Sequence, residues 1–145
     1  MKTIRTLLTI TLLLGAVSVY ARAESRPLVK ASIPFSFTVG NQSFPAGDYT
    51  ISTVQPQSRD VIQLRSADGE RVSFVFTLPS SSLDPSAQTK LIFQHYGSTY
   101  FLSQIWTLGD SAGRELVIPN RAKESAQNGS ISDVTTVVAS ASLSH

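Results

Sequence analysis

The chain has 145 residues, with 12 basic and 10 acidic residues and no cysteine. The lack of cysteine excludes a disulfide scaffold, catalysis by a thiolate and any zinc site with cysteine ligands. The basic residues form no cluster, so nothing in the composition supports nucleic-acid binding.

The first 23 residues have the three parts of a secretory signal peptide. Lys2 and Arg5 give a positive start, residues 6–19 form an apolar run, and residues 21–23 read Ala-Arg-Ala, a small-residue cleavage pattern. The run is about 14 residues long, short of the roughly 20 that span a membrane. We therefore expect export to the periplasm or the cell exterior, with no stable membrane span after cleavage. Cleavage would leave 9 basic and 10 acidic residues, a net charge of −1.

From residue 31 onward, apolar and polar residues alternate, which is typical of half-buried β-strands. The first stretch, ASIPFSFTV (31–39), is followed by five more: DYTISTV (48–54), DVIQLRS (60–66), RVSFVFTL (71–78), KLIFQHY (90–96) and TYFLSQIWTL (99–108). One face of the fourth stretch carries Val72, Phe74, Phe76 and Leu78.

The connections between these stretches have turn chemistry. Residues 45–48, 67–70 and 111–114 each contain two turn-forming residues, a glycine and a charged residue, which predicts hairpin loops with a left-handed glycine. A two-residue loop, Gly97-Ser98, is predicted to join the last two stretches. Its register pairs residues whose numbers sum to 195: His95 with Tyr100, Phe93 with Leu102, and Leu91 with Gln104.

Beyond Arg114 the alternation weakens. Pro119 ends a short candidate strand, and Asn120 is a candidate cap for a short helix over residues 121–127. The Ser/Thr/Val-rich segment 128–145 is either a last strand or a tail. We predict one all-β domain over residues 24–127, a small antiparallel β-sandwich or β-barrel of six to seven strands.

The stretch GDSAG (109–113) matches the G-x-S-x-G pattern of a hydrolase nucleophile elbow, with Ser111 as nucleophile. An elbow needs a long helix directly after the serine, and here only RELVI precedes Pro119. We therefore interpret GDSAG as a turn. His95 has no second ligand or orienting partner in the pattern, so we predict no catalytic residue, no metal and no cofactor.

The hairpin over residues 90–108 is apolar on both faces. Its second face carries Ile92, Tyr96, Phe101 and Ile105, whereas a sheet open to water on one side usually alternates. Three things could cover this face: the C-terminal segment, another subunit or a ligand. The candidate binding residues are the aromatic positions Tyr96, Tyr100, Phe101 and Trp106.

Three stretches carry a family resemblance: PFSFTVGNQSFPAGDYTI (34–51), LRSADGE (64–70) and KLIFQHYGSTYFLSQIWTLGDSAGREL (90–116). The chain resembles a family of small exported bacterial β-proteins with no known activity. The sequence pattern of this family is P-F-x-F-x-V-G followed by P-A-G-x-Y, and Y-G-x-x-Y-F-L followed by I-W. The resemblance covers about residues 31–124 and implies export and a compact β domain.

The leading hypothesis is a non-enzymatic exported domain that acts by contact with a protein, an envelope component or copies of itself. An alternative is a β-barrel that encloses a small apolar ligand. The residues expected to line that cavity are Phe35, Phe74, Phe76 and Phe93. Hydrolysis through Ser111 ranks last.

Overall fold

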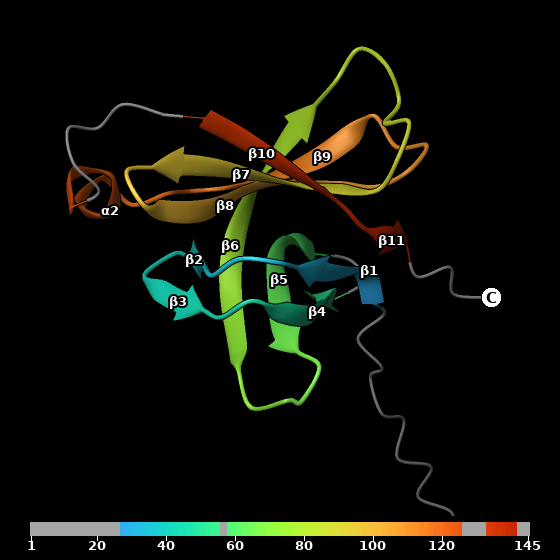
Figure 1. Cartoon of the computed structure of the whole chain (residues 1–145). Coiled ribbons are helices and arrows are strands. Elements are labelled where there is room, and N and C mark those ends of the chain that lie inside the picture. Colours follow the sequence, from blue (N-terminus) through green and yellow to red (C-terminus); the bar gives the residue numbers. More distant parts are fainter. Residues whose placement is uncertain (1–26, 56–57, 126–132, 142–145) are drawn as a thin grey trace, which may run out of the picture.

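The computed structural model describes residues 27–55, 58–125 and 133–141. Within these ranges the chain forms eleven strands and one six-residue helix, which confirms the all-β prediction (Figure 1). The elements are β1 (Pro27–Ile33), β2 (Phe37–Val39), β3 (Gln42–Phe44), β4 (Gly47–Gln55), β5 (Ser58–Ser66), β6 (Val72–Ser81), β7 (Lys90–Tyr96), β8 (Thr99–Trp106), β9 (Ala112–Leu116), α2 (Asn120–Ser125), β10 (Asp133–Val138) and β11 (Ser140–Ala141). The predicted signal peptide, residues 1–23, lies outside the described residues.

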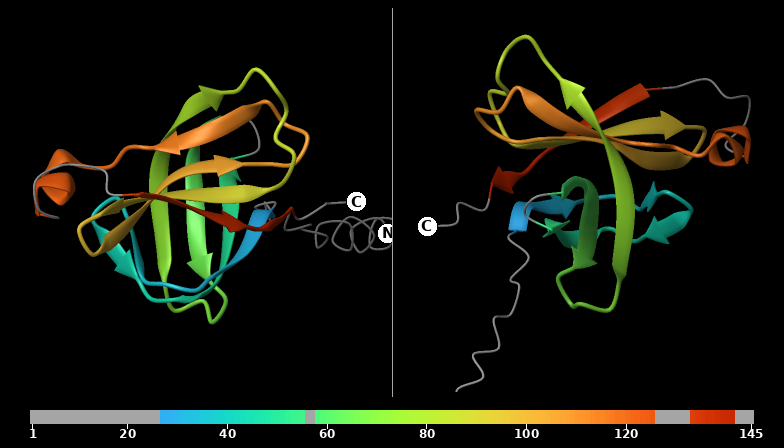
Figure 2. Two further views of the ribbon diagram at one scale, coloured as in Figure 1. Left: turned by 45° about the horizontal axis from the view of Figure 1, so that its top comes forward. Right: turned by 180° about the vertical axis from the view of Figure 1, so that it is seen from behind.

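The strands form two layers that share the long strand β6 (Figures 1 and 2). Hydrogen-bonded neighbours follow the order β10-β7-β8-β9-β6-β5-β4-β1-β11, and the sheet is not closed into a barrel. The first half of β6, residues 72–76, pairs with β5, whereas residues 77–81 pair with β9. Of the two predicted architectures, this arrangement is the sandwich.

Two details differ from the predicted six to seven antiparallel strands. The described strands are more numerous because bends divide segments that alternate as one unit: β1 is separated from β2 at residues 34–36, and β3 from β4 at residues 45–46. In addition, β2 pairs in parallel with β8, with Phe37 opposite Tyr100, so the sheet is mixed.

The C-terminal segment belongs to the same sheet. Residues 133–138 pair with residues 90–95 of β7, and β11 pairs with β1. The short helix α2 follows Pro119, whose carbonyl oxygen accepts a hydrogen bond from the Lys123 N–H at 3.2 Å. The described part of residues 128–145 is therefore strand.

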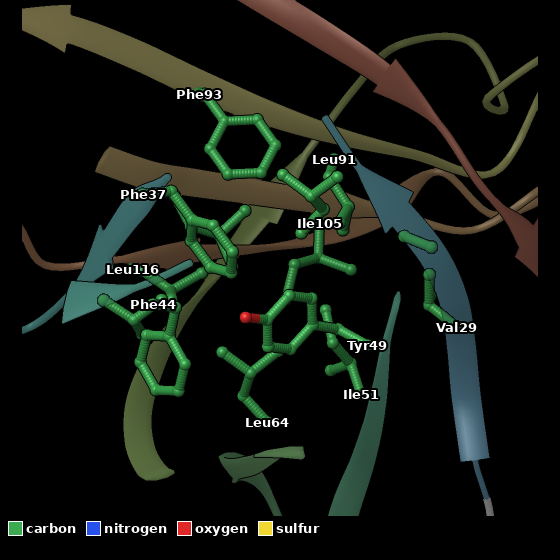
Figure 3. Close-up of a cluster of buried hydrophobic side chains, with 14 of the residues drawn as sticks. Val29, Phe37, Phe44, Tyr49, Ile51, Leu64, Leu91, Phe93, Ile105 and Leu116 are labelled. Atoms are coloured by element: carbon green, nitrogen blue, oxygen red, sulfur yellow. The ribbon is translucent and has the colours of Figure 1, made fainter. Parts of the chain in front are cut away.

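The core lies between the two layers (Figure 3). Aromatic rings meet edge to face at its centre, with Phe37 centred 5.1 Å from Tyr49 and 5.5 Å from Phe93. The Tyr49 hydroxyl donates to the Pro45 carbonyl oxygen at 2.6 Å, so its polar atom is satisfied inside an apolar cluster. Burial of one such ring stabilises the fold by about 2–3 kcal/mol.

Two of the four predicted loops are confirmed and two are wrong. Gly69 has a φ of 76° and its N–H donates to the Ser66 carbonyl oxygen, which confirms the left-handed glycine in residues 67–70. Gly97 has a φ of 59° between paired Tyr96 and Thr99, as predicted. The other two predictions are wrong, because Gly47, with a φ of 158°, is nearly extended at the start of β4, and Gly113 lies inside β9 without positive φ.

The register of the β7–β8 hairpin is confirmed near its loop and wrong farther away. His95 faces Tyr100 and Phe93 faces Leu102, but Leu91 faces Ile105, not Gln104. A β-bulge at Ser103 causes the shift, and the Ser103 hydroxyl donates to the Ile92 carbonyl oxygen at 2.9 Å. A bulge inserts one residue into one strand and so exchanges the two faces beyond it.

Candidate functional site

Ser111 lies in a turn followed by a strand. Gly109 has a φ of 77°, and the Asp110 N–H donates to the Thr107 carbonyl oxygen, which closes the turn one residue before the serine. Strand β9 begins at Ala112, so no helix follows Ser111 to complete an elbow. His145, the one histidine that follows Ser111 in the sequence, lies outside the described residues.

Three of the four predicted binding residues are buried by their own chain. Tyr96 and Phe101 form a small cluster with Ile118, which lies between β9 and α2. Trp106 packs against Gly113 so closely that a Cβ there would lie 2.8 Å from the indole ring. The second face of the hairpin is thus covered mainly by the segment that follows β8.

Tyr100, the fourth predicted residue, is partly buried in a stack of rings. The centroids of His95 and Phe35 each lie 4.2 Å from that of Tyr100, with interplanar angles of 13° and 24°. This stack lies on the core face of β8. His95 and Tyr100, which the predicted register pairs, are therefore brought together, in a packed arrangement at the end of the core.

The loop over residues 82–89 is tied to the turn after β8. Ser86 is buried, its N–H donates to the Asp110 carbonyl oxygen at 3.0 Å, and its carbonyl oxygen accepts from the Gly109 N–H at 2.9 Å. The Thr89 hydroxyl accepts from the Leu108 N–H at 3.0 Å. This loop lies over the hairpin near Trp106 and contributes to covering it.

Strand β6 presents a large uncovered apolar surface. The alternating residues that we call the β6 row point outward, with exposed fractions of 37% for Val72, 61% for Phe74, 78% for Phe76 and 55% for Leu78. The side chains between them, Ser73, Val75 and Thr77, face the interior and are buried or half-buried. The strand is therefore inverted, with its larger apolar side chains on the water side.

This inversion corrects the predicted ligand cavity. Phe93 is fully buried in the core and Phe35 packs against it edge to face, with ring centroids 5.1 Å apart. Phe74 and Phe76 lie on the outer surface. The four phenylalanines therefore do not line one interior space.

The first half of β6, residues 72–76, has a backbone edge that faces away from β5. The Ser66 N–H donates to the Arg71 carbonyl oxygen at 3.0 Å, which makes residues 66 and 71 a hydrogen-bonded pair. Because such pairs alternate along an antiparallel ladder, Val72, Phe74 and Phe76 direct their N–H and C=O groups away from β5.

Farther along β6, the corresponding groups are occupied. Strand β9 pairs with residues 77–81, and the Ser82 N–H donates to the Ser111 carbonyl oxygen at 2.9 Å. However, β9 ends at Leu116, opposite Thr77. In the same register the next residue, Val117, lies opposite Phe76, and no strand of the described ranges pairs with residues 72–75 on this side.

A groove of about 470 Å³ runs along this free edge; we call it the β6 groove. Its walls are residues 73–76 of β6, residues 39–42 at the tip of the β2–β3 hairpin, and Val117. The Arg71 Nη1 donates to the Ser43 carbonyl oxygen at 3.3 Å and so joins the start of β6 to β3. The groove therefore lies between two strands that do not pair with each other.

The turn before β6 is ordered by Asp68. Its carboxylate accepts hydrogen bonds from the Ser66 hydroxyl and, at 2.9 Å, from the Glu70 N–H. The hydrogen bond from Ser66, followed by that from Glu70 and the charge of Arg71, lowers the pKa of Asp68 below its usual 3.8. In the core beside this turn, burial raises the pKa of Tyr49.

A second hollow, of about 290 Å³, lies between the layers near the middle of β6. Its lining includes Asp60, Asp110 and Arg114, together with apolar groups such as Leu28 and Ile105. Because charged side chains of both signs line this hollow beside apolar ones, the hollow is not suited to a purely apolar ligand.

No group of three or more histidine, aspartate or glutamate side chains within the described ranges could hold a metal ion. None of the helices in these ranges is long and apolar enough to cross a membrane. No protein-family model matches the chain, and neither a curated protein nor a solved structure is significantly similar to it.

Proposed function

We propose that this chain is a non-enzymatic, exported β domain that acts by contact with a partner polypeptide. The observation that carries the proposal is the β6 row, because contiguous apolar side chains exposed on one strand mark interaction surfaces in soluble proteins. Phenylalanine rings at the centre of such a surface are suited to anchor a partner. The export signal predicted for residues 1–23 supports an envelope or extracellular location for the contact.

This proposal moves the contact surface from the predicted hairpin to β6. Tyr96, Phe101 and Trp106 are buried by residues of their own chain and would be reached only after local unfolding. Phe74 and Phe76 need no such rearrangement. The apolar-ligand alternative has less support, because these two rings lie outside the core.

In-cell photocrosslinking tests the proposal. A benzophenone amino acid replaces Phe76, and a control places it at Leu83, which is fully exposed in the loop 82–89 and is not part of the β6 row. We expect a crosslinked product of defined mass from position 76 that is lost when Phe74→Ser is added. Equal crosslinking from position 83, or no product from position 76, would contradict the proposal.

A further inference from the structure

We infer that the β6 groove receives a single extended segment of the partner polypeptide, which adds as a strand to residues 72–75. This inference rests on the proposed function and specifies how the contact is made. Val72 and Phe74 direct their N–H and C=O groups away from β5, where no strand of the described ranges pairs with them, and Phe74 lines the groove. Free strand edges of this kind recruit an extended peptide through main-chain hydrogen bonds.

The direction of the added strand follows from β9. Strand β9 runs antiparallel to β6 and stops at Leu116, opposite Thr77. Val117 follows β9, lines the groove and lies opposite Phe76 in the same register, so the added strand begins beyond it and meets Phe74 before Val72. At about 3.4 Å per residue, the four positions 72–75 take roughly 14 Å of extended chain.

The opposite wall of the groove leaves room for a single strand without a further sheet neighbour. Residues 39–42 stand beside the free edge, so a strand that already has a sheet neighbour on its other side would collide with the β2–β3 tip. The β6 row is also small. Four side chains exposed to these fractions amount to roughly 400 Å² of apolar surface, about half of what one partner contributes to a standard interface. A second folded copy therefore lacks the area for a stable dimer here, whereas a peptide strand adds main-chain hydrogen bonds.

The last described strand of the chain lies away from the groove. Strand β11 pairs with β1 at the opposite end of the molecule from the β2–β3 hairpin (Figures 1 and 2). The occupant is assigned to another polypeptide.

The side chains beside the edge specify the occupant's chemistry. Residues of the segment opposite Val72 and Phe74 lie on the outer face beside these side chains and Phe76, where apolar or aromatic groups form favourable cross-strand pairs. Residues opposite Ser73 and Val75 point inward, toward the sandwich, and must be small. The fitting segment is uncharged and alternates large apolar with small residues.

Peptide binding tests the inference. The probe is a synthetic peptide of alternating threonine and valine with a lysine at each end, titrated into ¹⁵N-labelled protein purified from the exported fraction. With the valines opposite the β6 row, their N–H groups face β6 and those of the threonines face away. We expect amide shifts at residues 72–76, and at least tenfold weaker binding when the valine nitrogens are methylated. Methylation of the threonine nitrogens should change binding little.

Each other outcome overturns the inference. Equal sensitivity to both methylated peptides would mean that the peptide does not add as a strand to β6. Shifts confined to other strands would place the peptide elsewhere, and no shift at millimolar peptide would mean that the edge does not recruit a strand. If crosslinking from Phe76 persists in these cases, the contact function stands and only strand addition fails.

Discussion

The β7–β8 hairpin and strand β6 both carry large apolar side chains outside the main core, but these side chains are buried in the hairpin and exposed in β6. Both place aromatic and branched side chains on a face that does not form the main core. In the hairpin this face is covered by Ile118, Gly113 and the loop 82–89, whereas in β6 nothing in the described ranges covers Phe74 or Phe76. The difference teaches that an apolar strand face stays exposed where the described part of the chain supplies no cover for it.

The largest expected effect tests this difference directly. Phe101→Ser removes a ring that is only 4% exposed, and we expect a loss of about 3–5 kcal/mol in the free energy of unfolding. Phe76→Ser should change it by no more than about 0.5 kcal/mol, as for other surface substitutions. Urea denaturation of both variants gives the two values. A cost for Phe76→Ser as large as that for Phe101→Ser would mean that the β6 row is covered in solution.

A smaller effect examines how the hairpin is covered. Gly113→Ala places a methyl group against the Trp106 ring and should cost about 1–3 kcal/mol while shifting the tryptophan emission, since the indole must move. Gly109→Ala is the control, because no atom lies within 4 Å of its new Cβ and only its φ of 77° is strained. That strain should cost about 1 kcal/mol and leave the emission unchanged. Identical emission in both variants would show that Gly113 does not pack on Trp106.

The smallest effect concerns the turn that leads into β6. Because the folded pKa of Asp68 is lowered, its carboxylate stabilises the fold above the ordinary value of 3.8, and this stability is lost as pH falls through the lower folded pKa. Asp68→Asn should therefore lower the melting temperature slightly near pH 7 and flatten its decline below about pH 4. Asp84→Asn, in the exposed loop, is the charge-matched control. A parallel decline in wild type and Asp68→Asn would contradict the turn's role.

The sequence allowed much of the strand content to be predicted, but only part of the candidate site. Alternation located the strands, and the register of the hairpin near Gly97-Ser98 followed from loop length alone. The bulge at Ser103 carries no local signal, since any short polar residue can occupy such a position. It moved Ile105 to the core face and Trp106 to the other face, which undid the predicted grouping.

The β6 row could be predicted as an alternating set, but not the side of the sheet on which it lies. The opposite face of the strand consists of Ser73, Val75 and Thr77, residues small enough to pack beneath a second layer. Alternation predicts that a strand has two different faces. It does not predict which face packs against the core when the side chains of either face could be buried.

By itself, the sequence determined the all-β class, the positions of most strands, the turn at Gly69 and the expectation of export, because these depend on local periodicity, turn chemistry and composition. Only the tertiary structure decided which strand faces are covered, that β6 is shared by two layers, and that β9 stops halfway along its edge. These features depend on where distant segments such as residues 39–42 and Val117 come to lie. The burial of a side chain depends on its neighbours in space, so it cannot be predicted from a short stretch of the sequence.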